Sequence, residues 1–330
     1  MSYKHPKKNS LKNTLKKFDL IVKFKRIIYK YLSLTFLLKK IFLILQLNKF
    51  FDLKLFKKIK FQTNKDKYFI HYSKNDIFIL SRKDRQISNS IYLNTVDRIK
   101  SLKMIENSKI FLNQLNKKNI SQIIDVGASI GNVIITALSK KVFETGIAIE
   151  PSEEEFKILK ANIILNSFEN KIQLYNCALT NSDAKFINFE IDENDIGDQR
   201  VHYKEYDGLY DEKNRKKVSV KNEMFDNLFE KVDLSNSLIW LNNQGSEAQV
   251  IDGGRKLLSK FKPPLILEYG PYYLKNSDSH SLLLKNIQEI YSNIYDPLNF
   301  KSFGEIKNFN FNKVYDDLGE RGDYTYFLII

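Results

Sequence analysis

The sequence predicts an α/β protein organised around an open, mainly parallel sheet. From residue 120 to the C-terminus, short apolar runs suited to buried strands alternate with longer segments suited to helices. The first run, Ile123–Val126, leads into a turn that contains Gly127 and Gly131, and then into the apolar segment Val133–Leu138. A strand, a glycine turn and a helix in this order form the first crossover of a parallel sheet.

The first 60 residues account for the whole net positive charge of the chain. They hold 17 Lys and Arg against two acids, whereas the other 270 residues have 36 basic and 37 acidic groups. Lys39 and Lys40 interrupt the longest apolar run there, so we expect neither a transmembrane helix nor a signal peptide. Residues 1–60 are therefore predicted to form a basic amphipathic arm that lies on an anionic membrane surface or packs on protein. Residues 61–330 are nearly neutral, which argues against nucleic acid as a partner. We expect a cytoplasmic protein.

Residues 61–119 are predicted to form a small entry subdomain ahead of the main domain, residues 120–330. Two β-branched and aromatic runs, Tyr68–Tyr72 and Ile77–Leu80, are separated by a short polar turn, which predicts a β-hairpin. Residues 94–116 carry a broken apolar stripe at helical spacing, which predicts a helix.

The turn after the first strand of the main domain is the predicted ligand site. Ligands of open parallel sheets lie outside the carboxyl ends of the strands, and Gly127 and Gly131 leave room for a nucleotide-sized group. Asp125 precedes this turn. Glu150 ends the next strand, where an acid can accept hydrogen bonds from both hydroxyls of an adenosine ribose. The predicted cofactor-binding residues are Asp125, Gly127, Ala128, Ser129, Gly131, Asn132 and Glu150.

The spacing of the glycines discriminates between nucleotides. A dinucleotide fold has G-x-G-x-x-G, so that a pyrophosphate can lie on the helix N-terminus. Here Gly127 and Gly131 stand four apart, Ala128 and Ser129 fill the gap, and Asp125 would repel phosphate. The pattern D-x-G-x-x-x-G followed by a strand-terminal acid resembles the cofactor site of S-adenosylmethionine-dependent methyltransferases.

The remaining elements follow in order along the chain. Ser152 and Glu155 stand at capping-box spacing at the start of a helix, with acids in its first turn. Strands are predicted at residues 171–176, 186–190, 218–220, 237–242, 264–268 and 324–330, with helices starting at 224, ending at 258 and covering 282–291. The polar stretch 192–217 is predicted to be a surface excursion that contributes to the acceptor pocket.

Cysteine and histidine usage limits the possible sites. The single cysteine, Cys177, excludes an intrachain disulfide framework and a thiolate metal cluster. The four histidines are widely scattered along the chain. We therefore predict no metal site.

From about Ser121 to the C-terminus, the order of motifs resembles the FkbM-type family of S-adenosylmethionine-dependent methyltransferases. The matching segments are residues 124–132, 149–151, 176–179, 196–201, 240–247 and 263–268. The block Trp240–Glu247, followed by Gly253 and Leu257–Leu258, makes the match specific. The resemblance implies a Rossmann-like sheet of seven strands with helices on both faces and S-adenosyl-L-methionine as cofactor. It also implies methyl transfer to a hydroxyl, often on a sugar or polysaccharide.

By position in these motifs, the candidate catalytic residues are Asn242, Gln244, Glu247 and Glu268. Glu247 and Glu268 are the candidate bases, whereas Asn242 and Gln244 are positioning amides. The family commonly has Asp where this chain has Asn242, and an amide has no basic lone pair that could accept a proton. Glu268 could instead be a strand-end acid that binds backbone amides, and Glu247 a first-turn helix acid favoured by the helix dipole.

Two other functions stay open at this point. A methyltransferase fold with weakened catalysis could serve as a binding module in glycan assembly at the membrane, and Asn242 is the residue that favours this alternative. A nicotinamide-dependent oxidoreductase is disfavoured by the missing third glycine. The predicted partners are a glycan or another hydroxyl-bearing substrate and, through residues 1–60, an anionic membrane surface.

Overall fold

A computed structural model describes residues 66–330 apart from 83, 85, 95, 116–119, 193–197, 206–207, 210–211 and 300. Asp66–Ile330 form one compact unit. The arm predicted at residues 1–60 lies outside the described residues, as do Ile196 and Gly197 of the matching motif segments.

The hairpin predicted ahead of the main sheet is present. Strands β1 (Tyr68–Tyr72) and β2 (Ile77–Ser81) pair antiparallel. Two helices follow, α4 (Ile87–Leu93) and α5 (Val96–Gln114), where the apolar stripe predicts only one. Asp84 accounts for the additional helix start, because its carboxylate accepts hydrogen bonds from three backbone N–H groups at the beginning of α4.

Two asparagines tie this hairpin to helix α7 (Glu153–Leu165). Asn162 accepts a hydrogen bond from the Ile79 backbone N–H (2.6 Å) and donates to the Ile79 carbonyl (3.3 Å). Asn166 makes the same pair of bonds with Ile77, at 2.9 and 2.7 Å. These side-chain amides act as a continuation of the ladder of β2, so the hairpin is anchored to the main domain.

The central sheet is the organising element of the described residues. Its eight strands lie in the order β13 (Ser302–Glu305), β12 (Asn293–Tyr295), β14 (Thr325–Ile329), β11 (Leu265–Tyr269), β10 (Ser237–Leu241), β3 (Gln122–Val126), β4 (Thr145–Ile149) and β5 (Ile172–Tyr175). Strands β5, β4, β3, β10 and β11 are parallel, and β14 runs antiparallel to β11 and to β12. Strand β3 therefore lies between β4 and β10, at the switch point where such sheets bind ligands.

The sheet has one strand more than the seven that the family resemblance implies. Strand β13 pairs antiparallel with β12 along the sheet edge, with a shift in register between Ile294 and Tyr295. Sequence patterning misses both strands because they are only three and four residues long. A period of two needs a longer run to be recognised.

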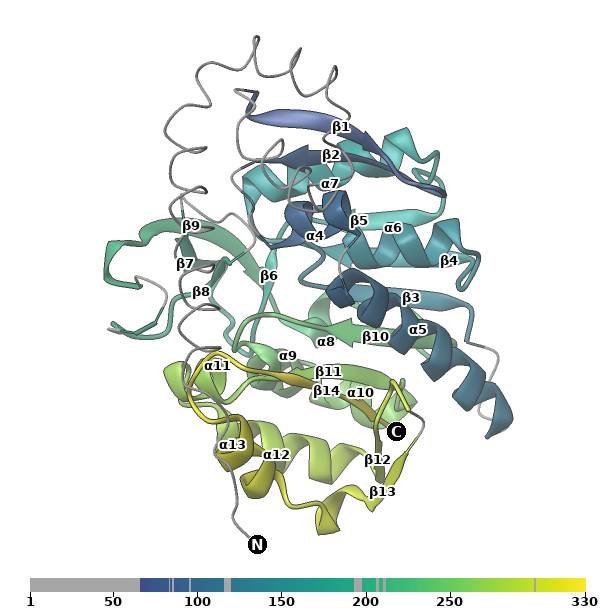
Figure 1. The fold of residues 1–330 in the computed structure, drawn as a ribbon. Coiled ribbons are helices and arrows are strands. Elements are labelled where there is room, and N and C mark those ends of the chain that lie inside the picture. The colour runs from purple at the N-terminus through teal and green to yellow at the C-terminus, as the bar shows by residue number, and fades with distance from the viewer. Residues whose placement is uncertain are drawn as a thin grey trace, which may run out of the picture. The chain divides into compact units, whose positions relative to one another are not determined.

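Two apolar cores lie on opposite faces of the central sheet. In β3, Ile123 belongs to one core and Ile124 to the other, as expected for successive strand residues. Helices α5, α6 (Asn132–Ser139) and α7 cover the first face (Figure 1). The second face is covered by α8 (Phe225–Leu228), α9 (Glu247–Gly253), α10 (Arg255–Phe261), α11 (Pro271–Asn276), α12 (His280–Ile290), the short 3₁₀ helix Ile306–Asn308 and α13 (Phe311–Leu318).

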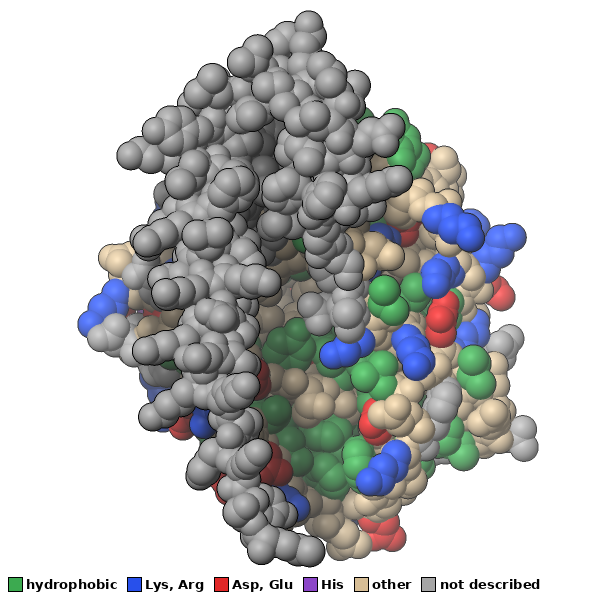
Figure 2. Space-filling model, viewed as in Figure 1, with side chains coloured by type: hydrophobic (Ala, Val, Ile, Leu, Met, Phe, Trp, Pro, Cys, Tyr) green, Lys and Arg blue, Asp and Glu red, His purple; other side chains and the backbone are tan. Residues whose placement is uncertain are grey.

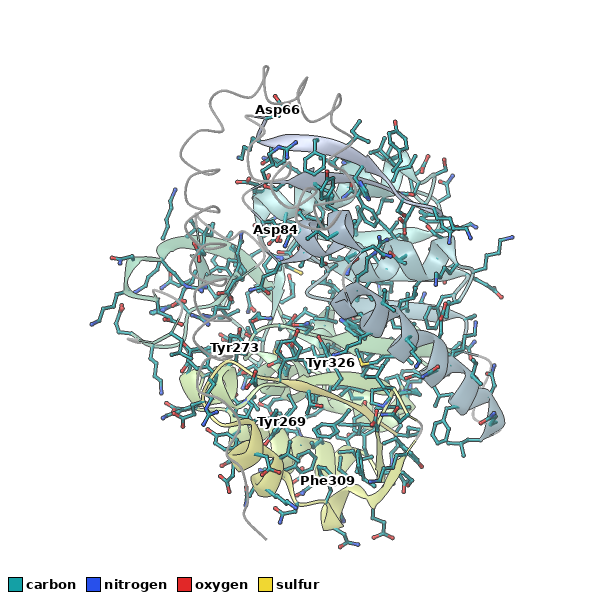
Figure 3. The ribbon with its side chains drawn as sticks, viewed as in Figure 1. Asp66, Asp84, Tyr269, Tyr273, Phe309 and Tyr326 are labelled. Atoms are coloured by element: carbon teal, nitrogen blue, oxygen red, sulfur yellow. The ribbon has the colours of Figure 1, made fainter. Side chains whose placement is uncertain are left out.

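Aromatic rings fill much of the second core (Figure 3). Tyr269 of β11 lies 5.7 Å from the ring of Phe327 on β14, measured between centroids. Phe309 lies 5.4 Å from that same ring. The antiparallel strand β14 is thus fixed beside β11 by edge-to-face packing as well as by backbone hydrogen bonds.

Residues 178–223 form a second sheet, which corrects the expectation that strands and helices alternate throughout. Its strands lie in the order β6 (Ala178–Leu179), β9 (Lys216–Glu223), β7 (Phe186–Ile191) and β8 (Arg200–Val201), with the 3₁₀ helix Glu212–Asn214 before β9. Strand β9 pairs parallel with β6 and antiparallel with β7. Exposed and buried residues alternate along β9, which is typical of an antiparallel strand with one face in solvent.

Charges are mixed on the visible part of the described surface. Figure 2 shows Lys and Arg side chains interspersed with Asp, Glu and apolar side chains over that face. This mixture agrees with the near-zero net charge of the sequence after residue 60. Among the helices of the described residues, none combines the length and the apolar character that crossing a membrane requires.

Candidate functional site

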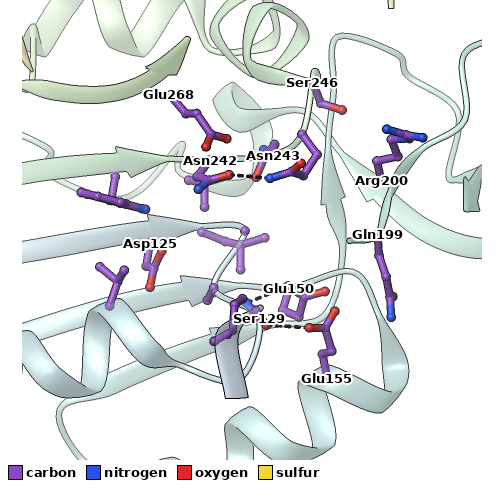
Figure 4. Close-up of a pocket in the computed structure, with 18 of the residues that line it drawn as sticks. Asp125, Ser129, Glu150, Glu155, Gln199, Arg200, Asn242, Asn243, Ser246 and Glu268 are labelled. Atoms are coloured by element: carbon purple, nitrogen blue, oxygen red, sulfur yellow. Dashed lines mark hydrogen bonds between the residues drawn. The ribbon is translucent and has the colours of Figure 1, made fainter. Parts of the chain in front are cut away.

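A cavity of about 400 Å³ lies at the carboxyl ends of the central parallel strands. Four residues at strand ends line it, namely Asp125 on β3, Glu150 after β4, Asn242 after β10 and Glu268 on β11 (Figure 4). Other parts of the wall come from α4, α5, α11, β14 and the second sheet. Small-molecule pockets occupy roughly 300–1,000 Å³, so this cavity is the candidate functional site.

Asp125 brings an unsatisfied carboxylate oxygen to the cavity wall. It is 1% exposed, and its Oδ2 accepts a hydrogen bond from the Ile134 backbone N–H at the start of α6 (3.2 Å). Its Oδ1 has no hydrogen-bond partner in the described part of the chain. Burial raises the pKa of Asp125 to about 7. A buried carboxylate with one unpartnered oxygen favours a ligand that carries positive charge or hydroxyl groups.

Two glutamates surround the turn after β3. Glu150 accepts hydrogen bonds from the backbone N–H groups of Ser129 and Ser152, both at 2.8 Å. Ser129 also donates its hydroxyl to Glu155 Oε1 (2.5 Å). Burial raises the pKa of both glutamates, and the negative charge of Glu150 adds to the effect on Glu155. The helix cap predicted at Ser152 is confirmed. The carboxylate of Glu155 also lines the cavity, and its position in the helix cap does not predict this.

The turns after β3 and β10 touch each other directly. A Cβ on Gly127 would lie 2.1 Å from the backbone oxygen of Asn242 and 2.5 Å from Oδ1 of Asn243. Gly127 has φ of +88°, and each turn also holds a non-glycine residue in the left-handed region, Ser129 in one and Gln244 in the other. Such strained conformations cluster at functional sites. The contact fixes the separation of the two halves of the cavity.

A chain of hydrogen bonds lines the half of the cavity formed by β10 and β11. Gln244 Nε2 donates to Asn242 Oδ1 (3.2 Å), and Asn242 Nδ2 donates to the Tyr326 hydroxyl (3.0 Å). The Tyr326 hydroxyl in turn donates to Glu268 Oε1 (3.2 Å). Glu268 Oε2 has no partner among the described residues. Burial raises the pKa of Glu268 to about 8, and the charge of Glu247 adds to this rise.

Glu247 occupies a different position from the other candidate catalytic residues. Its two carboxylate oxygens accept hydrogen bonds from the backbone N–H groups of Asn243 (2.7 Å) and Gly245 (2.9 Å). It is not part of the cavity wall formed by the described residues. Burial raises its pKa to about 7. The carboxylate therefore shapes the turn that carries Asn242 and Gln244.

Gly131 has a packing role in the turn after β3. Its φ is +92°, and a Cβ there would lie 2.6 Å from an Ile135 side-chain carbon and 2.9 Å from one of Leu159. Its absence of a side chain thus lets α6 approach α7. The other candidates of this turn line the cavity, namely Gly127, Ala128, Ser129 and Asn132.

The wall opposite the strand ends holds residues that are not among the individual site residues predicted from the sequence. The second sheet supplies Phe189, Gln199, Arg200 and Val201, and α11 supplies Tyr273. Figure 4 shows Gln199 and Arg200 across the cavity from Asn242 and Glu268. Gln199, Arg200 and Val201 lie in the motif segment 196–201 and in the polar stretch 192–217 that is predicted to contribute to the acceptor pocket, whereas Phe189 and Tyr273 have no such signal. In the described part of the chain, His, Cys, Asp and Glu do not gather into a group that could hold a metal ion.

The fold and the cavity together define the class of this protein. A doubly wound sheet whose first crossover carries a glycine turn, with strand-end acids beside it, is the architecture of the S-adenosylmethionine-dependent methyltransferases. The model of the methyltransferase FkbM domain matches residues 125–306, which is more than half of the chain. The chain belongs to the FkbM methyltransferase family, and its cofactor is S-adenosyl-L-methionine. Both predictions from sequence are confirmed.

Several solved structures resemble this chain at low identity. A putative transferase of Pyrococcus horikoshii has 16% identity over 81% of this chain and 72% of its own, with a TM-score of 0.39. TYW2 of M. jannaschii in complex with AdoMet has 11% identity over 81% and 85%, with a TM-score of 0.38. A StiE O-MT fragment has 12% identity over 68% and 71%, with a TM-score of 0.35. No curated protein matches the chain.

The cavity wall fits S-adenosyl-L-methionine. This molecule carries a sulfonium, an ammonium group and two ribose hydroxyls, all of which need electron-rich partners. The oxygens Asp125 Oδ1 and Asn132 Oδ1 lack hydrogen-bond donors within the described residues, and both residues line the cavity. Glu150 would hold the ribose hydroxyls, while Asp125 and Asn132 would hold the cationic amino-acid part.

Substitution of Gly127 tests whether the contact between the two turns maintains the cavity. Gly127→Ala should lower the free energy of unfolding by about 3 kcal/mol, because the new Cβ would displace the backbone at Asn242. Gly304→Ala is the matched control, since Gly304 has nearly the same φ (+87°) and open space around the added Cβ. We expect it to cost about 1 kcal/mol. Urea unfolding of both variants measures the difference, and equal losses would contradict the steric argument.

Proposed function

We propose that this protein is an O-methyltransferase that acts on a hydroxyl of a sugar or polysaccharide. The observation that carries the proposal is Glu268, a buried carboxylate on the cavity wall with one unpartnered oxygen. An alcohol gives up its proton reluctantly, and a carboxylate within reach can accept it in the transition state. The cofactor, when bound, supplies an electrophilic methyl group. The protein therefore has mainly to hold the hydroxyl in line and to remove its proton.

Each residue of the hydrogen-bond chain has a role in this mechanism. Tyr326 donates to Glu268 Oε1 and stabilises the ionised carboxylate, which leaves Oε2 to take the acceptor proton. Asn242 orients Tyr326 through its amide, and Gln244 orients Asn242. Glu247 holds the backbone of their turn.

The partners on which this proposal rests are the ones predicted from sequence. A glycan or another hydroxyl-bearing molecule is the acceptor, and nucleic acid is not, because the chain after residue 60 has no excess of basic groups. The alternative, a binding module with weakened catalysis, drew its support from Asn242. The donation from Asn242 to Tyr326 gives that amide a positioning role, which favours the enzyme.

Binding of the cofactor can be measured without knowing the acceptor. We expect S-adenosyl-L-methionine to bind the full chain with micromolar Kd in calorimetric titration, and Asp125→Ala with Glu150→Ala to abolish binding. Because the pKa of Asp125 is about 7, the cationic ligand should release protons at pH 7. The apparent binding enthalpy should then vary with the ionisation enthalpy of the buffer. A folded natural chain that does not bind would remove the proposal.

The base is tested by the pH dependence of methyl transfer. Glu268 is mostly protonated at pH 7 in the empty cavity and can accept a proton only when ionised, so the rate should rise with pH, with a midpoint below about 8 because the bound cationic cofactor favours the ionised acid. Glu268→Gln should remove this rise and lower kcat by about 10²- to 10⁴-fold. The assay follows labelled methyl transfer to a panel of neutral methyl glycosides.

Two controls separate chemistry from binding in that experiment. Glu268→Gln should bind the cofactor as the natural chain does, because Glu268 lies on β11 and not on the cofactor turns. Tyr326→Phe should keep the pH dependence but move it to higher pH, since it removes a hydrogen bond that stabilises the carboxylate. An unchanged pH profile in Glu268→Gln would assign the base elsewhere. Cofactor binding without methylation of any glycan would favour the binding module.

We further propose that residues 1–60 attach this protein to the cytoplasmic face of a membrane rich in anionic lipid. The support is the sequence alone, with 17 basic groups among large apolar residues. The full chain should co-sediment with vesicles that contain phosphatidylserine, and a variant lacking residues 1–60 should not. Binding should weaken as salt increases, because the attraction is screened. Binding that is independent of salt, or equal binding by the shortened variant, would refute this attachment.

A further inference from the structure

Arg200 is a buried guanidinium on the cavity wall with an unmet hydrogen-bonding need. The residue is 6% exposed, and it stands at the start of β8. Its Nε donates to Glu190 Oε2 (3.2 Å), and its Nη2 donates to Glu212 Oε1 (2.8 Å). Its Nη1 has no hydrogen-bond partner within the described part of the chain. Buried polar groups almost always have a partner, so an exception on a cavity wall calls for a ligand.

Arg200 is tied to the strand that carries the proposed base. The Tyr272 hydroxyl donates to Glu212, which holds Nη2 of Arg200. Tyr272 belongs to α11, which begins directly after β11 and therefore close to Glu268. Arg200 also lies beside Gln244 and Tyr273, because the three line a second, smaller recess together. It therefore borders the half of the cavity formed by β10 and β11.

The charge around Arg200 is already more than balanced. Glu190 and Glu212 bind it directly, and the charge of Asp198 also acts on it. Arg215 is the other cation of this cluster and is itself paired with Asp198. Three carboxylates thus face two guanidinium groups, and His202 Nδ1 also lies 2.7 Å from Glu190 Oε1. Across the cavity stands another acid, Glu268.

This balance decides which ligand group Arg200 can hold. An anionic group such as a carboxylate or phosphate would meet several carboxylates in a site of low dielectric, where like charges repel strongly. An uncharged oxygen of a hydroxyl, ether or ring accepts the same hydrogen bond without that repulsion. Gln199, whose Oε1 also lacks a partner in the described chain, adds an acceptor for a hydroxyl on the same wall.

We propose that Arg200 recognises the acceptor through an uncharged oxygen next to the reactive hydroxyl, and that the site selects neutral sugars over uronates and sugar phosphates. This inference rests on the proposed function and narrows its substrate class. Arg200 is a specificity-determining residue in it, held rigid by Glu190 and Glu212 so that its remaining donor has a fixed direction.

The test measures binding of matched sugar pairs to the full chain in the presence of S-adenosylhomocysteine. A panel of neutral methyl glycosides is titrated beside the corresponding uronates and 6-phosphates, with detection by saturation-transfer NMR at pH 8, where histidine is ordinarily neutral. At least one neutral glycoside should bind about tenfold more tightly than its charged counterparts. Arg200→Lys keeps the positive charge but removes the planar guanidinium and its fixed donors. It should weaken binding of that glycoside about tenfold. Glu190→Gln removes one negative charge and should therefore reduce the ratio of the affinity for the neutral glycoside to that for the uronate.

Controls keep the inference separable from the function on which it rests. Lys217→Gln changes an exposed residue of the second sheet and should leave sugar binding unchanged. If Arg200→Lys does not fold, the discrimination by the natural chain and its change in Glu190→Gln decide the question. Tighter binding of the charged sugars, an unchanged affinity in folded Arg200→Lys, or binding of S-adenosylhomocysteine without any neutral sugar would overturn the inference. Failure of the natural chain to bind S-adenosylhomocysteine would instead overturn the proposed function.

Discussion

The close approach of two turns is the constraint on which the site depends. Gly127 has no side chain, so the backbone oxygen of Asn242 can occupy the place where a Cβ would stand. Parallel pairing of β3 with β10 brings these turns to the same edge of the sheet, but pairing alone does not set their distance. The glycine does, and it places the cofactor half of the cavity against the half that carries Asn242 and Glu268. In the proposed reaction, a larger residue would separate the methyl donor from the acceptor hydroxyl beside Glu268, and the methyl carbon and hydroxyl oxygen must approach to roughly 3 Å.

The cavity holds a concentration of buried acids that the protein itself does not neutralise. Asp125, Glu150 and Glu155 lie on one side and Glu268 on the other, and burial raises the pKa of each. In the empty protein, the folded state therefore keeps these acids protonated between about pH 4 and 8, where the unfolded chain releases the protons. As pH rises through that window, these groups make the free energy of unfolding fall. A cation in the cavity reverses the effect by favouring the ionised acids. The site is thus less stable when empty and is suited to a positively charged cofactor.

The sequence predicts the parts of this site that are encoded locally. Asp125, the glycine turn and Glu150 lie within 26 residues, and strand, turn and helix follow each other without interruption. The residues of the opposite wall are not encoded locally. Arg200 reaches the cavity only because residues 178–223 fold into a separate sheet, whose pairing is set by tertiary contacts that no local period records. Glu155 was missed for a different reason, because its helix-cap position is sufficient to explain an acid there.

Asn242, where the family commonly has Asp, is compatible with the buried Glu268 beside it. With Glu268 buried one strand away, an Asp at position 242 would add a second carboxylate to the same low-dielectric half of the cavity, and the two could not easily both ionise. An amide avoids this competition and contributes a donor instead, which orients Tyr326 toward Glu268. The chain from Gln244 to Glu268 then ends in a single acid with one free oxygen. An amide at position 242 is therefore compatible with the proposed function, in which the surrounding network leaves Glu268 as the base.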